Sequence, residues 1–279
     1  MTAALSYDQL VFSGGGTRCF WHGGFLDIVR DAIGLAPKRI AAVSGGALSA
    51  TTFISGRGRR LLKETTDTFA GQDHNIAWHD LVEGEGITPH QRLYRQIVEE
   101  TIDAEAQKTV AEGPSCEVLI GHPPGDDPDR WTAMAATGAY EAELHVVNSP
   151  HFHWAKKTGL GWSLVDARRA AAESKLADLV CAAATIPPLF DLARWNGRPV
   201  IDGGMADQAP LPSRDEGRTL ILLTRRYRNL PDDDRLDYVA PEEETPADKI
   251  DFTDPEKIRA TWDCGQRDGR RFLERNGLT

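Results

Sequence analysis

Ser44 is the first residue of this sequence that its neighbours mark for chemistry. It follows a short apolar run at residues 40–43 and precedes Gly45 and Gly46. A serine at a sharp turn between a strand and a helix stands above the sheet, and the next amide, that of Gly45, points toward a developing oxyanion. The pattern differs from G-x-S-x-G because Ala42 stands two residues before the serine. It predicts a nucleophile, and an N-cap serine before an ordinary helix is the alternative.

A run of three glycines, Gly14, Gly15 and Gly16, forms the second stretch. It follows a predicted strand at residues 7–12 and is followed two positions later by Arg18. Consecutive glycines let the backbone present several amides to an anion. A nucleotide phosphate is one alternative, but the lysine of a P-loop and the further glycine of a dinucleotide fingerprint are both missing. The sequence therefore favours a transient oxyanion as the anion.

Asp202 begins the third stretch and is followed by Gly203 and Gly204. It comes at the end of a predicted hairpin, whose arms at residues 192–195 and 198–201 are joined by an Asn-Gly turn. A carboxylate in a covered glycine turn is poorly solvated, which favours its use as a base. An ordinary turn aspartate is the alternative.

The elements that must position these residues alternate between strand and helix. Further strands are predicted at residues 117–121, 143–148 and 220–223, and a helix at residues 174–184. A last helix is predicted after a capping signal near residue 254. This alternation predicts an α/β fold with a buried parallel sheet.

The length and charge of the chain indicate one domain over residues 1–279. With 279 residues, 41% of them hydrophobic, the chain can bury a core without disulfide staples. Residues 57–115 are expected to form a helical, cap-like insertion. The net charge of −10 is mostly local, because residues 231–251 hold nine acidic and only two basic residues. We expect that stretch to be an acidic surface loop.

The composition also limits the partners and the compartment. No basic stripe with interleaved aromatic residues is present, which argues against nucleic acid. The four cysteines form no C-x-x-C pair, and neither a leader nor a long apolar run is found. These features predict a cytoplasmic protein with reduced thiols and no membrane span. A small basic cluster allows weak peripheral contact with an anionic membrane, although packing is the simpler interpretation. The cluster consists of Arg57, Arg59, Arg60 and Lys63.

Three histidines, His145, His151 and His153, raise the question of a metal site. No cysteine or carboxylate at matched spacing completes a set of ligands. We therefore expect no metal and no cofactor.

Taken together, the three glycine-flanked stretches resemble the patatin-like phospholipase family. The pattern of that family is a Gly-Gly-Gly-x-Arg loop, a G-x-S-x-G elbow and an Asp-Gly-Gly or Asp-Gly-Ala turn. The similarity runs from about residue 10 to residue 211 and includes His22 and Gly24. Three positions depart from the family pattern, namely Ala42, Cys19 and Gln208. None of them removes a reacting atom.

The resemblance implies a three-layer α/β/α sandwich with a mostly parallel central sheet and a Ser–Asp dyad. Ser44 is then the nucleophile of a lipid acyl-ester hydrolase of phospholipase A or lysophospholipase type, and Asp202 is the base. The substrate is a phospholipid or another acyl-ester lipid. The oxyanion hole is assigned to Gly14, Gly15, Gly16, Arg18 and Gly45, and the supporting turn to Gly203 and Gly204.

Other interpretations stay open at this point. One is a non-catalytic lipid-binding protein on the same fold, and another is a small-ester esterase or a thioesterase. His22 resembles a triad base, but its helical spacing from Arg18 predicts that it packs inside the protein instead.

Overall fold

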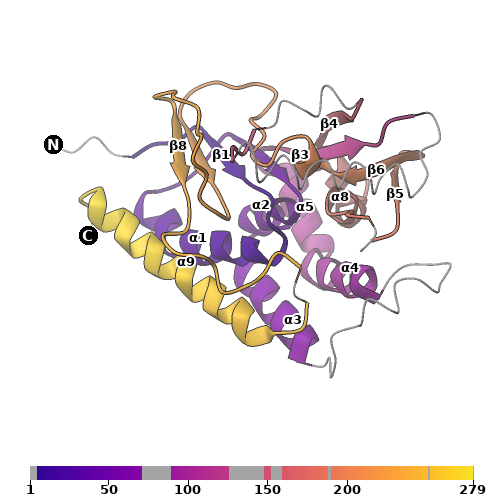
Figure 1. Cartoon of the computed structure of the whole chain (residues 1–279), viewed down its shortest axis with the longest axis horizontal. Coiled ribbons are helices and arrows are strands. Elements are labelled where there is room, and N and C mark those ends of the chain that lie inside the picture. Colours follow the sequence, from indigo (N-terminus) through magenta and orange to yellow (C-terminus); the bar gives the residue numbers. More distant parts are fainter. Residues whose placement is uncertain are drawn as a thin grey trace.

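Strands and helices alternate along the chain, as an α/β fold requires (Figure 1). The computed structural model describes residues 5–70, 89–125, 148–151, 159–187, 190–250 and 252–278. The strands are β1 (Gln9–Phe12), β2 (Arg39–Val43), β3 (Ser115–His122), β4 (Gly161–Asp166), β5 (Ala193–Trp195), β6 (Arg198–Asp202), β7 (Thr219–Leu222) and β8 (Leu236–Val239). The helices are α1 (Phe20–Ala32), α2 (Gly45–Ser55), α3 (Gly58–Ala70), α4 (Pro89–Thr101), α5 (Ala104–Glu112), α7 (Ala167–Ala172), α8 (Leu176–Ala183) and α9 (Pro255–Arg275), with the 3-10 turns η1 (Gly16–Cys19) and η3 (Gly203–Met205).

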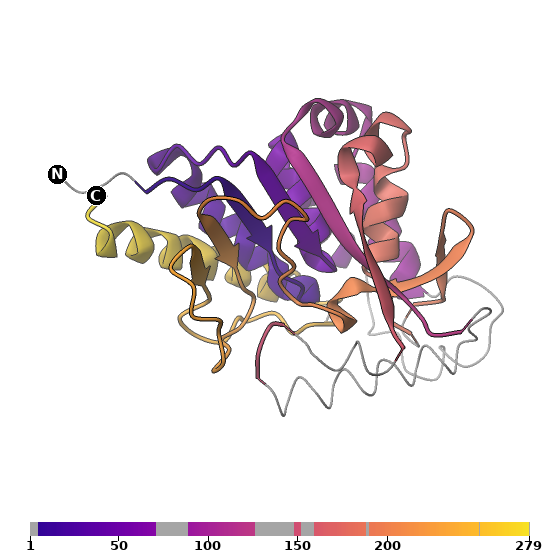
Figure 2. The ribbon, with the colours of Figure 1, turned by 90° about the horizontal axis from the view of Figure 1, so that it is seen from above.

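A single sheet joins these strands in the order β5-β6-β3-β2-β1-β7-β8, and β4 also pairs with β3. The central pairs β3–β2, β2–β1, β1–β7 and β7–β8 are parallel, whereas β4 and β6 run antiparallel to β3. Figure 2 shows β1, β2 and β3 side by side at the centre of the molecule. Because parallel strands end at the same edge of a sheet, the residues that follow β1 and β2 meet there.

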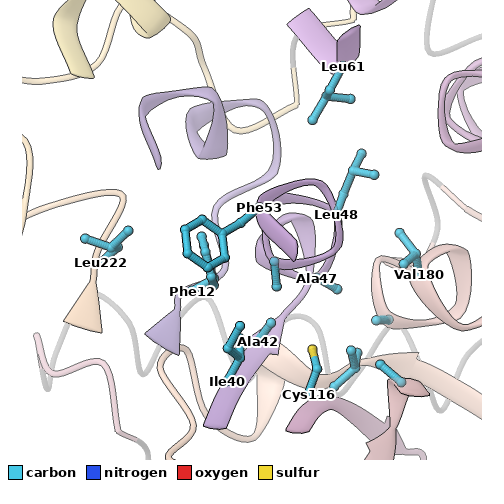
Figure 3. Packing of buried hydrophobic residues seen from close by; sticks show 14 of the residues in the cluster. Phe12, Ile40, Ala42, Ala47, Leu48, Phe53, Leu61, Cys116, Val180 and Leu222 are labelled. Atoms are coloured by element: carbon cyan, nitrogen blue, oxygen red, sulfur yellow. The ribbon is translucent and has the colours of Figure 1, made fainter. Parts of the chain in front are cut away.

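Helices flank this sheet, which confirms the predicted α/β/α architecture. Phe12 and Ala42 lie on the face covered by α2, where the ring of Phe12 packs 5.8 Å from that of Phe53 (Figure 3). The alternate residues of the same strands, such as Val11 and Ala41, belong to a separate buried cluster. This alternation is the period of two expected for a strand buried on both faces.

Helix α9 packs along α1 (Figure 1). A side chain on Gly24 would overlap the carbonyl of Trp262, so glycine is needed for the two backbones to approach this closely. The indole nitrogen of Trp21 donates a buried hydrogen bond of 2.8 Å to Asp268 of α9. The last helix therefore fixes the helix that follows the glycine loop.

The hairpin is confirmed, and its turn has the predicted geometry. Asn196 and Gly197 have φ values of 49° and 80°, and positive φ at both central residues is the mark of a type I′ turn. Its second arm, β6, ends at Asp202 and pairs with β3 at Ile120 and Gly121. The hairpin thus delivers Asp202 to the edge of the sheet.

The acidic stretch differs from the predicted surface loop because it contains a strand. Strand β8 lies within residues 231–251 and adds to the sheet in parallel beside β7. Leu236 and Tyr238 pack against a buried cluster, while Asp237 between them accepts hydrogen bonds from Tyr7 at 2.7 Å and from Arg218 at 2.7 Å. Paired charges on one side and apolar contacts on the other let this acidic segment join the sheet.

Other predictions meet the structure in different ways. The described parts of residues 57–115 form α3, α4 and α5 before β3 begins, so this region is helical as expected. Strand β4 was not predicted. The strand predicted at residues 143–148 lies, apart from its last residue, outside the described residues. None of the described helices is both long enough and apolar enough to cross a membrane.

Candidate active site

Ser44 occupies a tight turn between β2 and α2. Its φ of 55° and ψ of −137° put a residue with a side chain in a conformation that is rarely populated. Strain of this kind is typical of a nucleophile elbow, which lifts the hydroxyl clear of the sheet. A side chain on Gly46 would overlap the carbonyl of Ser13, so the turn requires a very small residue there. Ala42 is fully buried beneath α2, and its methyl group is accommodated.

Asp202 lies beside this serine, although the two are 158 positions apart in the sequence. The hydroxyl of Ser44 donates a hydrogen bond of 2.6 Å to Oδ2 of Asp202. Oδ1 of the same carboxylate accepts a bond of 2.7 Å from the amide of Gly204. A side chain on Gly203 would overlap the carbonyl of Leu119, so the glycine allows the turn to pack against β3. The two oxygens of Asp202 are thereby held in fixed directions.

Burial determines the electrostatics of this carboxylate. Asp202 is 4% exposed, and its desolvation raises the pKa from 3.8 to about 6. The hydrogen bonds from Ser44 and Gly204 and the positive charge of Lys249 act in the opposite direction and lower it. The result is a carboxylate that is more basic than an ordinary aspartate and still mainly ionised at neutral pH.

The glycine loop packs against the serine turn. A side chain on Gly14 would come 3.2 Å from the Cβ of Ser44, and one on Gly45 would come 3.2 Å from the amide nitrogen of Gly16. Within the described part of the chain, the amides of Gly15, Gly16 and Gly45 donate to no backbone or side-chain acceptor. They are therefore available to an oxyanion that forms on Ser44.

The amide of Gly14, which was predicted to belong to the oxyanion hole, already has an acceptor. It donates a hydrogen bond of 3.0 Å to the carbonyl of Gln208. The side chain of Gln208 in turn donates a bond of 2.8 Å to the carbonyl of Gly204. Gln208, one of the departures from the family pattern, thus ties the glycine loop to the turn after Asp202.

Arg18 is not among the described residues that line the cavity of Ser44, so this geometry does not support its assignment to the oxyanion hole, which stays a prediction. Its side chain lines a separate polar cavity with Thr224 and Glu242. Thr17 and Cys19, its two neighbours on η1, line the cavity that holds Ser44. Side chains on a 3-10 turn are spaced by about 120°, so consecutive residues must point to different sides.

Several contacts around the glycine loop were not predicted. The hydroxyl of Thr224 donates a bond of 2.6 Å to the carbonyl of Gly14. The amide of Thr17 donates to the carbonyl of Lys249 at 3.3 Å, and the hydroxyl of Thr17 donates to the carbonyl of Asp248. These partners come from late in the chain and bond mostly through backbone atoms, so no local sequence pattern marks them.

His22 is packed inside the protein, as predicted. The residue is fully buried, and its ring lies edge-on to Phe12 with a centroid distance of 5.7 Å. Burial lowers its pKa to about 3, so the imidazole is neutral. It does not line the cavity that holds Ser44. A role as the base is therefore not supported.

An apolar cavity opens at Ser44. Helices α2, α3 and α4, the segment after α8 and the segment before α9 form most of its walls. The lining side chains are mostly aliphatic or aromatic: Leu48, Leu61, Phe69, Ile97, Ile186, Phe190, Ile250 and Phe252. Such a space suits an acyl chain.

The predicted basic cluster is neutralised by acids. Arg57 pairs with Asp103 at 3.1 Å and with Glu105 at 2.7 Å, and Arg60 also pairs with Asp103. The remaining pairs are Arg59–Asp27 and Lys63–Asp67. These charges are already compensated, which weakens the case for headgroup binding at this cluster.

The histidine group is only partly described, because residues 145 and 153 lie outside the described residues. The Nδ1 atom of His151 lies 3.0 Å from Asp207, and its Nε2 lies 3.1 Å from the hydroxyl of Tyr238. Both ring nitrogens are thus engaged. Among the described residues, no group of three or more histidine, cysteine or acidic side chains is arranged to hold a metal.

Comparisons with known proteins show the family and agree with the fold. The family model for patatin-like phospholipase matches residues 10–214. A solved structure, that of VipD from Legionella pneumophila, is similar with a TM-score of 0.52 at 12% identity, over 97% of this chain and 67% of that chain. At this identity the similarity concerns the fold alone. No curated protein sequence matches the chain.

Proposed function

The chain belongs to the patatin-like phospholipase family, and from this premise we propose that it is a lipid acyl-ester hydrolase of phospholipase A or lysophospholipase type. In this proposal Ser44 is the nucleophile and Asp202 the general base. The observation that carries the proposal is the buried hydrogen bond of 2.6 Å from the hydroxyl of Ser44 to Asp202.

The proposed reaction proceeds through an acyl-enzyme. Oγ of Ser44 attacks the ester carbonyl, and its proton passes to Asp202. The tetrahedral intermediate then expels the alcohol, which takes that proton as it leaves. A water molecule, deprotonated by the same carboxylate, attacks the acyl-enzyme and releases the fatty acid. A carboxylate with a pKa near 6 is suited to both steps, because it is ionised at neutral pH and more basic than an exposed aspartate.

The developing negative charge needs donors that are fixed in place. In the proposal the amides of Gly15, Gly16 and Gly45 supply them, because these amides have no other described acceptor and belong to the residue after Ser44 and to the loop that packs against it. Loss of one such donor typically reduces transition-state stabilisation by roughly 3 kcal/mol. The start of α2 directly after Ser44 favours the same charge through the helix dipole.

A fluorophosphonate probe tests the nucleophile directly. We expect covalent labelling of the protein and loss of the label in Ser44→Ala. Ser49 provides a matched control, because it lies on α2 and lines the same cavity. Labelling should persist in Ser49→Ala. Labelling that survives in Ser44→Ala contradicts the proposal.

Product analysis separates the proposed activity from the alternatives. A lipid-binding protein without catalysis shows no labelling and releases no fatty acid. A small-ester esterase cleaves short aryl esters but not intact phospholipids, whereas a lipid acyl hydrolase cleaves phospholipids and releases free fatty acid.

A further inference from the structure

The segment around Lys249 is held firmly against the glycine loop. Its backbone carbonyl accepts a hydrogen bond of 3.3 Å from the amide of Thr17, and the preceding carbonyl, that of Asp248, accepts one from the hydroxyl of Thr17. A side chain on Gly16 would overlap the carbonyl of Lys249. This segment lies beyond residues 10–214, which the family model covers. These contacts place the backbone of residue 249 beside the site.

Lys249 borders the cavity where the substrate is expected to lie. Its Cγ would be 3.5 Å from a Cβ placed on Gly16, so the side chain starts at the glycine loop itself. It lines the cavity that holds Ser44 and is the one charged side chain among the described residues that do so. Its positive charge is also felt by Asp202, whose pKa it lowers. The lysine and the proposed dyad therefore share one electrostatic environment.

Ile250, the neighbour of Lys249, lies near the mouth of the cavity, and Lys249 itself is half-buried. Ile250 also lines the cavity and is 45% exposed, whereas Phe252 and Phe69 of the inner wall are 8% and 1% exposed. A cation at the mouth of an apolar cavity interacts more strongly with an anion than it would in bulk water. The acyl chain of a substrate can thus lie against the apolar inner wall, while an anionic group of the same substrate lies near Lys249.

We propose that Lys249 is a specificity-determining residue, which pairs with the phosphate of a glycerophospholipid while the acyl chain occupies the apolar cavity. The inference rests on the proposed function. In a glycerophospholipid only a few bonds separate the phosphate from the acyl ester carbonyls. With the carbonyl fixed at Ser44, the phosphate falls within reach of a flexible four-carbon side chain that starts at the oxyanion loop. A diacylglycerol presents the same ester and chains but no anion.

The test compares two substrates with identical acyl chains. Dihexanoyl phosphatidylcholine and dihexanoyl glycerol are both used as dispersed monomers, so that adsorption to a lipid surface plays no part. The readout is the ratio of kcat/KM for the phospholipid to kcat/KM for the diacylglycerol. Lys249→Met removes the charge and keeps the length of the side chain, and Lys249→Arg keeps the charge.

We expect the ratio to fall at least about tenfold in Lys249→Met, which corresponds to about 1.4 kcal/mol. Lys249→Arg should keep most of the wild-type ratio. Lys63→Met is the control for loss of one positive charge, because Lys63 lies on α3, pairs with Asp67 at 2.7 Å and does not line the cavity. Its ratio should equal that of the wild type. A merely structural role of Lys249 reduces both rates together and leaves the ratio unchanged.

The outcomes separate this inference from the proposed function. A wild-type enzyme that cleaves both substrates, with a ratio that stays within about twofold in Lys249→Met, overturns only the role of Lys249. A wild-type protein that cleaves neither ester overturns the proposed function and this inference with it. Should Lys249→Met not fold, Lys249→Gln, checked by its thermal unfolding, is measured in the same way, and an unchanged ratio has the same meaning.

Discussion

Replacement of Asp202 by asparagine changes activity and stability in opposite directions. Asparagine has the shape of aspartate, so Oδ1 still accepts from the amide of Gly204, and the side-chain amide then donates to the hydroxyl of Ser44. The site keeps its hydrogen bonds but loses its base. General base catalysis typically contributes a factor of about 10² to 10⁴, so we expect kcat to fall roughly a thousandfold.

The stability of the same variant follows from the raised pKa of Asp202. Because the pKa is about 6 in the folded protein and 3.8 as the ordinary value, ionised Asp202 destabilises the fold at neutral pH. A difference of about two pKa units corresponds to roughly 3 kcal/mol. This destabilisation is absent below pH 3.8, grows as the pH rises toward 6 and is complete above it. Asp202→Asn should therefore be more stable than the wild type by up to roughly 3 kcal/mol at about pH 8 and nearly equal to it at about pH 4.

The assay combines turnover of a lipid ester with urea unfolding at the two pH values. Asp207→Asn is the matched control, because Asp207 lies on the loop after Asp202 but bonds to His151 rather than to the serine. Asp207→Asn keeps the proposed base, so its fold-loss of turnover should be at least about tenfold smaller than that of Asp202→Asn. Near-native turnover in Asp202→Asn refutes the assignment of the base. A variant that is destabilised at about pH 8 refutes the argument from burial.

Four further outcomes follow from the same geometry. The value of kcat/KM should depend on ionised Asp202, so it should fall as the pH drops through about 6, and a profile that stays flat down to pH 4.5 contradicts this. Gly16→Ala should lose at least a hundredfold in kcat, since the added methyl group overlaps the carbonyl of Lys249 and φ is 57°; wild-type kinetics in this variant contradict the close approach. His22→Gln should keep kcat within about threefold while its melting temperature falls, because the buried imidazole takes no part in proton transfer; a loss as large as that of Asp202→Asn restores histidine as the base. Gln208→Ala, which removes the side-chain bond to the turn after Asp202, should lower kcat about tenfold in a steady-state assay, and an unchanged kcat shows that this bond does not position the site.

The backbone conformations that were predicted correctly are those that a few adjacent residues determine. Ser44 lies at a turn that its own glycine neighbours make possible, and the Asn196-Gly197 turn sets the hairpin that ends at Asp202. In both cases a few adjacent residues determine the backbone conformation. Nothing in the sequence alone required Ser44 and Asp202 to touch, and that expectation came from the family resemblance.

The features that were not predicted depend on the direction of a side chain or on contacts between residues that are far apart in the sequence. Arg18 belongs to the recognised motif, yet the 3-10 turn directs its side chain to another cavity. Strand β8 lies in a stretch whose acidity indicated a loop, because the pairing of Asp237 with Tyr7 and Arg218 is visible only in three dimensions. Lys249 reaches the glycine loop through its backbone carbonyl, which any residue type supplies.

The release of fatty acid from intact phospholipid is the most direct test of the central claim that Ser44 and Asp202 form the catalytic centre of a lipid hydrolase. Wild type and Ser44→Ala are incubated with the same mixed phospholipid extract, and the products are identified by mass spectrometry. We expect free fatty acid and the matching lysophospholipid from the wild type and neither product from Ser44→Ala. Equal release by both proteins, or no release by the wild type, contradicts it.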